Sequence, residues 1–176
     1  VTFAPLAATS YGGTVTVSAD QTSGTTTIAA SGTGTNTAPP QTLFTTQTPA
    51  GTYAGTYELG MQFQSSASGQ VTALRFYKPS GETGTHVGTL WNASGQALAT
   101  VTFSGESASG WQQQSLATPV SVTANTVYTV SVNANSVWPG TPGGLVSAVT
   151  NGALSSLADG SGRNGLYGTT PGSYPG

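Results

Sequence analysis

Several of the residues that could do chemistry in this chain gather in one short stretch, RFYKPSGETGTHVGTLWNASG, residues 75–95. It holds two of the three basic residues, Arg75 and Lys78, the only histidine, His86, and one of the five acids, Glu82. Only 5% of the chain is charged, so this concentration is what an active site would look like. The alternative is that the stretch is the most polar corner of a structural β-module.

Nucleophilic catalysis needs a Ser or Thr beside a base that a third group orients. His86 is the sole histidine, its nearest acid in sequence is Glu82, and no Gly-x-Ser-x-Gly elbow accompanies them. We therefore expect the ring of His86 to pack under the strand that contains RFYK, residues 75–78, with one ring nitrogen bonded to backbone.

Paired carboxylates are the second catalytic option. Glycoside hydrolysis needs two of them about 5–10 Å apart, and Glu58, Glu82 and Glu106 fall on or beside different expected strands. Ion pairs with Arg75 and Lys78, or solvated turns, are the structural roles we favour for these acids. We predict that the chain is not an enzyme.

Metal and cofactor chemistry has little support in the sequence. The chain has no cysteine, which excludes disulfides, thiolate catalysis and Cys-ligated metals. No Asp-x-Asp-x-Asp run exists, so a calcium site would rest on Asp159 or Glu82 with backbone oxygens. We predict no cofactor, with calcium as the low-ranking exception.

A glycan is the ligand that the sequence favours most. Sugars stack on flat aromatic faces and need amide or hydroxyl partners around them. Trp138 lies in the Gly- and Pro-rich segment NSVWPGTPGG, and we group it with Asn133, Asn135 and Tyr167 as a candidate carbohydrate site. The competing interpretation is that Trp138 caps the end of a β-sandwich.

Composition excludes several other partners. A net charge of −2 with three basic residues is unsuited to binding nucleic acid or an anionic membrane surface. No apolar run approaches the roughly 20 residues of a membrane-spanning helix. We therefore predict neither nucleic-acid binding nor membrane insertion.

The same composition predicts an all-β chain. Thr, Ser, Val and 25 Gly dominate, and no apolar period of 3.6 residues persists over ten positions. In YELGMQFQ, apolar Tyr57, Leu59, Met61 and Phe63 alternate with more polar neighbours, as in a half-buried antiparallel strand. Similar runs predict further strands at 70–78, 86–92, 96–103, 111–122 and 126–134, with Leu90 or Trp91 pointing inward. This is the strand count of a sandwich or jelly roll.

Residues 36–56 contain Ala-Pro-Pro and no charged residue, so we interpret them as a linker or arm. Leu43 and Phe44 are the exception, and we expect them to pack onto the domain that follows.

The longer part of the chain carries a specific resemblance. The motifs are RFYK at 75–78, TGTHxGxLW at 83–91, Glu106 followed by Gly110-Trp111, Pro119-Val120 and Tyr128. They are similar to a family of extracellular bacterial β-sandwich domains of unknown function, over about residues 57–176. The resemblance implies structural roles for Arg75, Lys78, Glu82, His86, Trp91, Glu106 and Trp111, and it implies that the usual closing strand is lacking after residue 176.

The first 35 residues carry a second resemblance. VTFAPLAATSYGGTVTVSADQTSGTTTIAASGTGT resembles the closing half of a Hydin-type immunoglobulin-like domain, with Tyr11, Val15 and Val17 matching one strand and 31–35 matching the end. The fold expected for the chain is therefore an Ig-like partial β-sheet, residues 1–35, a Pro-containing arm, 36–56, and an antiparallel, jelly-roll-like β-sandwich, 57–176.

These observations lead to a functional hypothesis. We predict a non-enzymatic, extracellular or cell-surface bacterial module that self-associates head to tail, its sandwich completed by the N-terminal strands or the 36–56 arm of a neighbour. Its partners could equally be neighbouring domains of a longer chain. The alternative is a carbohydrate-binding or adhesive module of a larger secreted protein.

Overall fold

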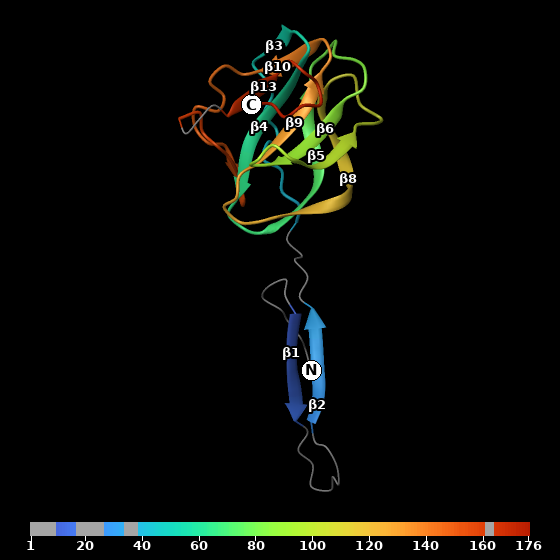
Figure 1. Ribbon diagram of the computed structural model, residues 1–176, viewed down its shortest axis with the longest axis vertical. Coiled ribbons are helices and arrows are strands. Elements are labelled where there is room, and N and C mark those ends of the chain that lie inside the picture. The colour runs from blue at the N-terminus through green and yellow to red at the C-terminus, as the bar shows by residue number, and fades with distance from the viewer. Residues whose placement is uncertain (1–9, 17–26, 34–38, 161–163) are drawn as a thin grey trace. The chain divides into compact units, whose positions relative to one another are not determined.

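The computed structural model describes residues 10–16, 27–33, 39–160 and 164–176, and every regular element in them is a β-strand. The chain divides into two compact units, Val1–Pro40 and Gln41–Gly176. The all-β prediction is therefore confirmed (Figure 1).

The described part of the first unit is a single antiparallel pair. Strand β1 (Ser10–Thr16) pairs with β2 (Thr27–Thr33), and the register sets Val15 opposite Ile28. The sequence predicts strands in GGTVTVSAD, residues 12–20, and in TTTIAASGTGT, residues 25–35; β1 begins two residues before the first segment, and β2 lies within the second. A short preceding strand predicted at VTFAP, residues 1–5, lies outside the described residues.

The second unit is built on one large antiparallel sheet with the strand order β11-β12-β4-β9-β6-β7, and β13 also pairs with β4 (Figure 1). Strands β4 and β9 form because each alternates apolar residues with small or polar ones. The strands of this sheet are β4 (Tyr57–Ser65), β6 (Val87–Asn92), β7 (Ala97–Thr102), β9 (Tyr128–Ala134), β11 (Thr150–Asn151), β12 (Leu154–Ser156) and β13 (Gly165–Gly168).

Two smaller antiparallel sheets complete this unit. Strand β5 (Gly69–Lys78) pairs with β8 (Gly110–Val122), with a register shift between Val71 and Ala73. Strand β3 (Gly51–Ala54) pairs with β10 (Val137–Gly140). The sandwich thus sets β5 and β8 against the large sheet.

The hydrophobic core lies between the large sheet and the β5–β8 pair. Leu90 on β6 is completely buried, and the site that a Cβ on Gly88 would occupy is only 2.9 Å from the Phe103 ring. The buried members from both layers are Phe63, Leu74, Leu90, Phe103, Leu116, Val122 and Tyr128. Because β8 adjoins β7 and β5 lies towards β6, the β5–β8 pair covers the β6–β7 half of the large sheet.

The opposite face of the large sheet is covered by the C-terminal segment. Tyr174 meets Trp91 edge-on, with ring centroids 5.6 Å apart, and Pro175 is buried against Gly60, where a Cβ would approach the proline ring to 2.8 Å. Of the two residues expected to point inward from β6, Leu90 therefore does so. Trp91 is also buried, but on the other face of the sheet.

The segment that precedes β3 lies against the second unit. Phe44 stacks on Trp111 with a centroid distance of 6.0 Å, and Leu43 packs against the core. The Trp111 Nε1–H donates to the Gln47 carbonyl at 3.0 Å, and Asn151 donates to the Thr42 carbonyl. The expected packing of Leu43 and Phe44 is confirmed, and from Gln41 onward the arm is part of the sandwich unit.

No helix long and apolar enough to span a membrane occurs among the described residues.

Candidate functional site

The polar residues singled out by the sequence form a buried cluster at one end of the sandwich. His86 is completely buried, with Nδ1 2.9 Å from both Glu106 carboxylate oxygens and Nε2 3.1 Å from Glu82 Oε1. Lys78 Nζ donates to Glu106 Oε2 at 2.8 Å. The cluster thus joins the two acids, Glu82 and Glu106, through His86, and Lys78 forms an ion pair with Glu106.

Glu82 holds the loop that links β9 to β10. Its carboxylate accepts the backbone N–H groups of Asn135, Ser136 and Val137 at 2.6, 3.1 and 2.6 Å, and the Ser136 hydroxyl at 2.9 Å. Glu82 lies in the segment between β5 and β6, so these bonds tie that segment to the β9–β10 loop. A carboxylate that accepts this many bonds has little capacity left for a substrate or a metal ion.

The ionisation of these acids follows from their partners. Burial disfavours the charged form of Glu82, but the hydrogen bonds from Asn135, Val137, His86 and Ser136 outweigh burial and lower its pKa to about 2. For Glu106, the bonds from Lys78 and His86 likewise outweigh burial and lower the pKa. Both carboxylates are therefore charged at neutral pH.

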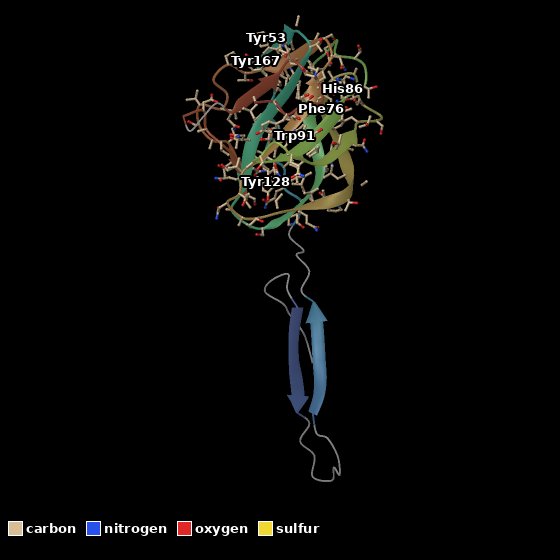
Figure 2. All side chains as sticks on the ribbon, viewed as in Figure 1. Tyr53, Phe76, His86, Trp91, Tyr128 and Tyr167 are labelled. Atoms are coloured by element: carbon tan, nitrogen blue, oxygen red, sulfur yellow. The ribbon has the colours of Figure 1, made fainter. Side chains whose placement is uncertain are left out.

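The expectation for His86 was right about its packing and wrong about its bonding. Its ring lies beside Phe76 of β5, with centroids 5.0 Å apart (Figure 2). Both ring nitrogens, however, face carboxylates rather than backbone. The contact with Glu106 could not be predicted from the sequence, because Glu106 lies in the segment between β7 and β8, distant from His86 along the chain.

Arg75 does not form the ion pair expected of it. Its guanidinium carbon lies 5.0 Å from the centroid of the Trp111 ring, and Nη1 donates to the Phe44 carbonyl at 3.0 Å. No carboxylate in the described ranges forms a salt bridge with it. Glu82 and Glu106 are engaged elsewhere, and Arg75 lies on the opposite face of β5 from Lys78, since residues of odd separation alternate in a strand.

A third acid, Glu58, is buried on the outer face of the large sheet. It accepts the Ser131 hydroxyl at 2.5 Å and the Gly172 N–H at 2.8 Å, while Trp91 Nε1–H donates to the same Ser131 oxygen at 2.8 Å. Burial raises the pKa of Glu58, and its two hydrogen bonds offset that only in part. This network anchors the C-terminal segment and does not bring Glu58 beside another acid.

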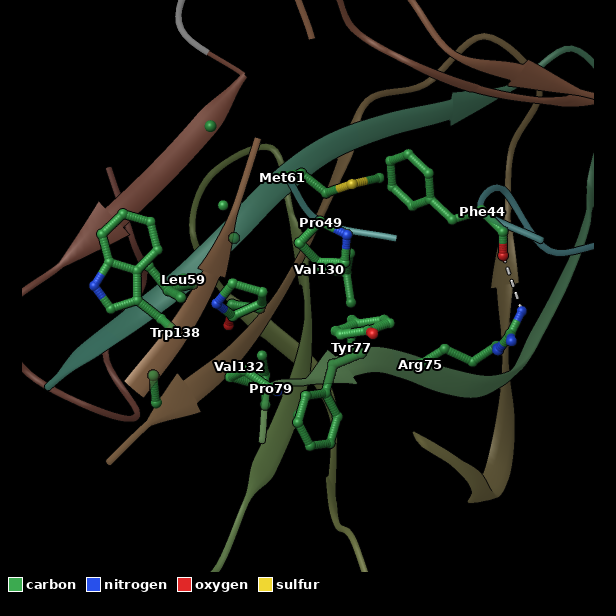
Figure 3. Close-up of a pocket in the computed structure, with 18 of the residues that line it drawn as sticks. Phe44, Pro49, Leu59, Met61, Arg75, Tyr77, Pro79, Val130, Val132 and Trp138 are labelled. Atoms are coloured by element: carbon green, nitrogen blue, oxygen red, sulfur yellow. Dashed lines mark hydrogen bonds between the residues drawn. The ribbon is translucent and has the colours of Figure 1, made fainter. Parts of the chain in front are cut away.

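A half-open groove of about 780 Å³ lies on the inner face of β4 and β9. Figure 3 shows Leu59 and Met61 of β4 and Val130 and Val132 of β9 along it, with Tyr77 and Arg75 of β5 on its other side. Phe44 and Pro49 of the arm also line it, Phe44 next to Arg75, and Trp138 lies at the opposite end from Arg75. The lining is mostly apolar and aromatic.

Burial along β4 and β9 is reversed from what a sandwich normally gives. The polar residues of these strands are buried, because the C-terminal segment and the segment between β5 and β6, which contains Glu82, cover them. They are Glu58, Thr129, Ser131 and Asn133. Their apolar neighbours on the groove side, Leu59, Met61, Val130 and Val132, are only half-buried. Alternation predicted a half-buried strand with Leu59 and Met61 on one face, but alternation does not show how far another layer covers that face.

The edge of β5 borders this groove. In the described chain β5 forms ladder hydrogen bonds with β8 alone, and β10 lies near β5 without pairing with it. No backbone hydrogen bond joins the 41–50 arm to β5 among the residues that the structure places. The groove is therefore flanked by an unpaired strand edge.

Two nitrogen donors that line the groove lack a partner. Arg75 Nε and Trp138 Nε1 are buried, and neither finds an acceptor in the part of the chain that is described. Buried N–H groups are costly when unbonded, so an occupant that offers carbonyl or hydroxyl oxygens would be stabilised here.

Trp138 and Tyr167, two of the four residues proposed to bind a glycan, meet around Tyr57. Tyr57 contacts the Trp138 ring and the Tyr167 ring edge-on, at 6.2 and 6.0 Å between centroids, and Tyr53 stacks on Trp138 at 4.6 Å. Tyr53 and Tyr167 are 41% and 57% exposed, so this end of the groove presents aromatic rings to solvent.

The other two, Asn133 and Asn135, are engaged inside the protein. Asn133 accepts the Val87 N–H and donates to the carbonyl of Thr85 and to Asn135, and Asn135 donates to the Thr83 carbonyl. Their amides hold the strand and loop that carry Glu82 and His86. Asn133 still lines the groove, next to the aromatic end.

Metal binding has no support in the described ranges, where no three His, Asp or Glu side chains gather as ligands. Of the two residues on which a calcium site would rest, Glu82 is surrounded by N–H donors, and Asp159 accepts the Asn164 N–H.

These features define an antiparallel β-sandwich module with a buried ion-pair cluster and an open inner face. The chain belongs to the family described as "Domain of unknown function (DUF4082)", whose model matches residues 43–176. The comparisons with curated proteins and with solved structures found no match.

Proposed function

We propose that this chain is a non-enzymatic structural module of the bacterial cell surface, completed by a β-strand from a neighbouring copy and so able to form a filament or surface fibre. The observation that carries the proposal is the half-open apolar groove beside the unpaired edge of β5. An added strand would gain main-chain hydrogen bonds from that edge and bury its apolar side chains in the groove.

The polar cluster supports the non-enzymatic part of the proposal. Glu82, Glu106 and His86 bond to one another, to Lys78 and to backbone, and His86 is completely buried. Side chains with such saturated partners serve as structural ties, because a catalytic acid or base must reach a substrate within hydrogen-bond distance.

The finer part of the resemblance belongs to the same proposal. We assign residues 1–35 to the closing half of an Ig-like domain, supported by the antiparallel β1–β2 pair. The predicted extracellular location rests on the low charge and the absence of cysteine, both common in secreted bacterial β-modules.

The molar mass of the purified full chain as a function of concentration tests this proposal. We expect the mass to rise with concentration, and we expect Val130→Asp, which places a charge in the groove, to lower association by an order of magnitude or more. Thr118→Asp is the matched control, since Thr118 is exposed on β8 away from the groove. A wild-type chain that stays monomeric at every concentration would contradict the proposal.

The second candidate is a carbohydrate-binding module, favoured by the rings around Trp138. Tyr53 and Tyr167 are exposed there, and the Trp138 Nε1–H is free to donate within the described chain. If this candidate holds, the chain binds a glycan in an array as a monomer and Trp138→Ala abolishes that binding, while Trp111→Ala at the opposite end retains it.

A further inference from the structure

The groove beside β4 and β9 has the dimensions of a small-molecule site. Its volume of about 780 Å³ falls within the roughly 300–1,000 Å³ that such sites occupy. The large sheet contributes Leu59, Met61, Val130 and Val132 to the lining, and each of the four is only half-buried. An apolar occupant would remove more of these side chains from water and be stabilised by the hydrophobic effect.

Few polar groups inside the groove are left for a ligand. The Asn133 amide is bonded to neighbouring residues, and the Ser131 hydroxyl donates to Glu58 on the other face of the sheet. Glu82 is the one acid among the described residues that line the groove, and it accepts backbone N–H groups of the β9–β10 loop. Within the groove, a mainly apolar ligand is therefore better matched than a sugar, whose many hydroxyl groups each need a partner.

Arg75 places a cation at one end of the groove (Figure 3). Its Nη1 donates to the Phe44 carbonyl at 3.0 Å, and its guanidinium lies over the Trp111 ring. Its Nε is buried, and neither Nε nor Nη2 is hydrogen-bonded within the described residues. Nε and Nη2 form one edge of the planar guanidinium, and such an edge binds a carboxylate through two parallel hydrogen bonds.

The opposite end of the groove offers a second donor. The Nε1–H of Trp138 is buried and finds no acceptor in the part of the chain that is described. An indole N–H can only donate, so the matching atom of a ligand is an oxygen acceptor. A ligand that reaches both ends therefore needs an oxygen at each end and an apolar body between them.

We propose that the groove binds an elongated apolar carboxylate, of the class of a fatty acid that carries an oxygen at its far end. The carboxylate lies on the Nε–Nη2 edge of Arg75, the methylene chain lies along Met61 and Leu59, and the far oxygen accepts the Trp138 Nε1–H. This inference goes beyond the proposed function and does not require it. Both occupants use the same groove, so a bound carboxylate excludes an added strand.

Calorimetric titration of the full chain with ω-hydroxydecanoate, and with decane-α,ω-diol as its neutral counterpart, tests the role of Arg75. We expect the native chain to bind the carboxylate about tenfold or more tightly than the diol, because hydrogen bonds between charged groups are the stronger ones. In Arg75→Gln this preference should vanish while the affinity for the diol is unchanged, which shows that the groove is intact. Arg75→Lys keeps the charge and should keep part of the preference.

Decanoate, which lacks the far hydroxyl, tests the role of Trp138. Trp138→Phe keeps an aromatic ring and removes the N–H, so the hydroxyl of ω-hydroxydecanoate is left buried without its donor. We expect the affinity for ω-hydroxydecanoate to fall about tenfold in this variant, and the affinity for decanoate to fall much less.

The outcomes also separate this inference from the proposed function. Equal affinities of the native chain for ω-hydroxydecanoate and the diol, or an unchanged preference in Arg75→Gln, would overturn the assignment of the carboxylate to Arg75. No binding of either ligand would overturn the inference as a whole. The titrations use chain concentrations at which the mass measurement finds monomers, so binding by a chain that never associates contradicts strand addition alone, and association without binding contradicts the ligand site alone.

Discussion

At the scale of single residues, the most informative side chain is Glu82. A carboxylate at 3% exposure is stable only because backbone and side-chain donors surround it, and those donors come from the β9–β10 loop and from His86. Its role is to fix the geometry of one end of the sandwich. The chain therefore uses its rare charges for positioning.

Replacing Glu82 should be costly. In Glu82→Gln the amide nitrogen is a donor placed among other donors, so we expect the free energy of unfolding to fall by about 3–5 kcal/mol, as when one partner of a buried charged network is removed. Chemical denaturation measures the loss. Asp159→Asn, at an exposed acid, is the control and should change stability by less than about 0.5 kcal/mol. A loss from Glu82→Gln no larger than the control's would contradict the structural role.

The acids also predict an asymmetric response to pH. The pKa of Glu82 is lowered from 4.5 to about 2, so between these values the unfolded chain binds more protons and acid favours unfolding. The raised pKa of Glu58 has the opposite effect on stability. Above pH 4.5 the folded state still holds the proton that the unfolded chain has lost, so this contribution to stability falls as pH rises. We expect denaturation midpoints of the native chain to fall from pH 4.5 towards pH 2.

Two variants separate these contributions. Glu82→Gln should flatten the dependence between pH 4.5 and about 2, and Glu58→Gln should remove the opposing contribution above pH 4.5. Identical pH profiles for the native chain and Glu82→Gln would show that Glu82 is not held as a charged group in the fold.

At the scale of elements, the C-terminal segment acts as a cover for the polar face of the large sheet. Gly172 bonds Glu58, Tyr174 lies on Trp91, and Pro175 packs on Gly60. The C-terminal segment, which is short and irregular, thus covers one face of the large sheet, and the β5–β8 pair covers part of the other face.

Removing the ring of Tyr174 should expose Trp91. We expect Tyr174→Ala to lower the free energy of unfolding by roughly 1–3 kcal/mol, less than for a fully buried aromatic residue because Tyr174 is half-buried. Tryptophan emission should shift to longer wavelength. Tyr167→Ala, at 57% exposure, is the control and should lose less stability. Unchanged emission from Tyr174→Ala would argue against this packing.

Elements differ in how well the sequence predicts them. Strands β4 and β9 were predictable, because their apolar residues alternate over seven or more positions. Strands β3 and β10 to β13 have two to four residues each and were not predicted, since such lengths show no period and depend on the neighbour that pairs with them. The partners of Arg75 and His86 were missed because tertiary proximity decides them.

At the scale of the whole molecule, the proposed function depends on one surface of the second unit. The groove leaves Leu59, Met61, Val130 and Val132 half-buried beside an edge of β5 that no described strand pairs with. Low charge makes such a surface compatible with burial against another chain. The sequence predicted self-association by strand exchange, and this groove is the surface at which we propose that it occurs.

The central claim, that one copy completes the next, is tested most directly by electron microscopy of the full chain at high concentration. The account predicts unbranched filaments with a regular axial repeat for the native chain, and their loss in Val130→Asp but not in Thr118→Asp. Dispersed single particles of the native chain at high concentration would contradict it.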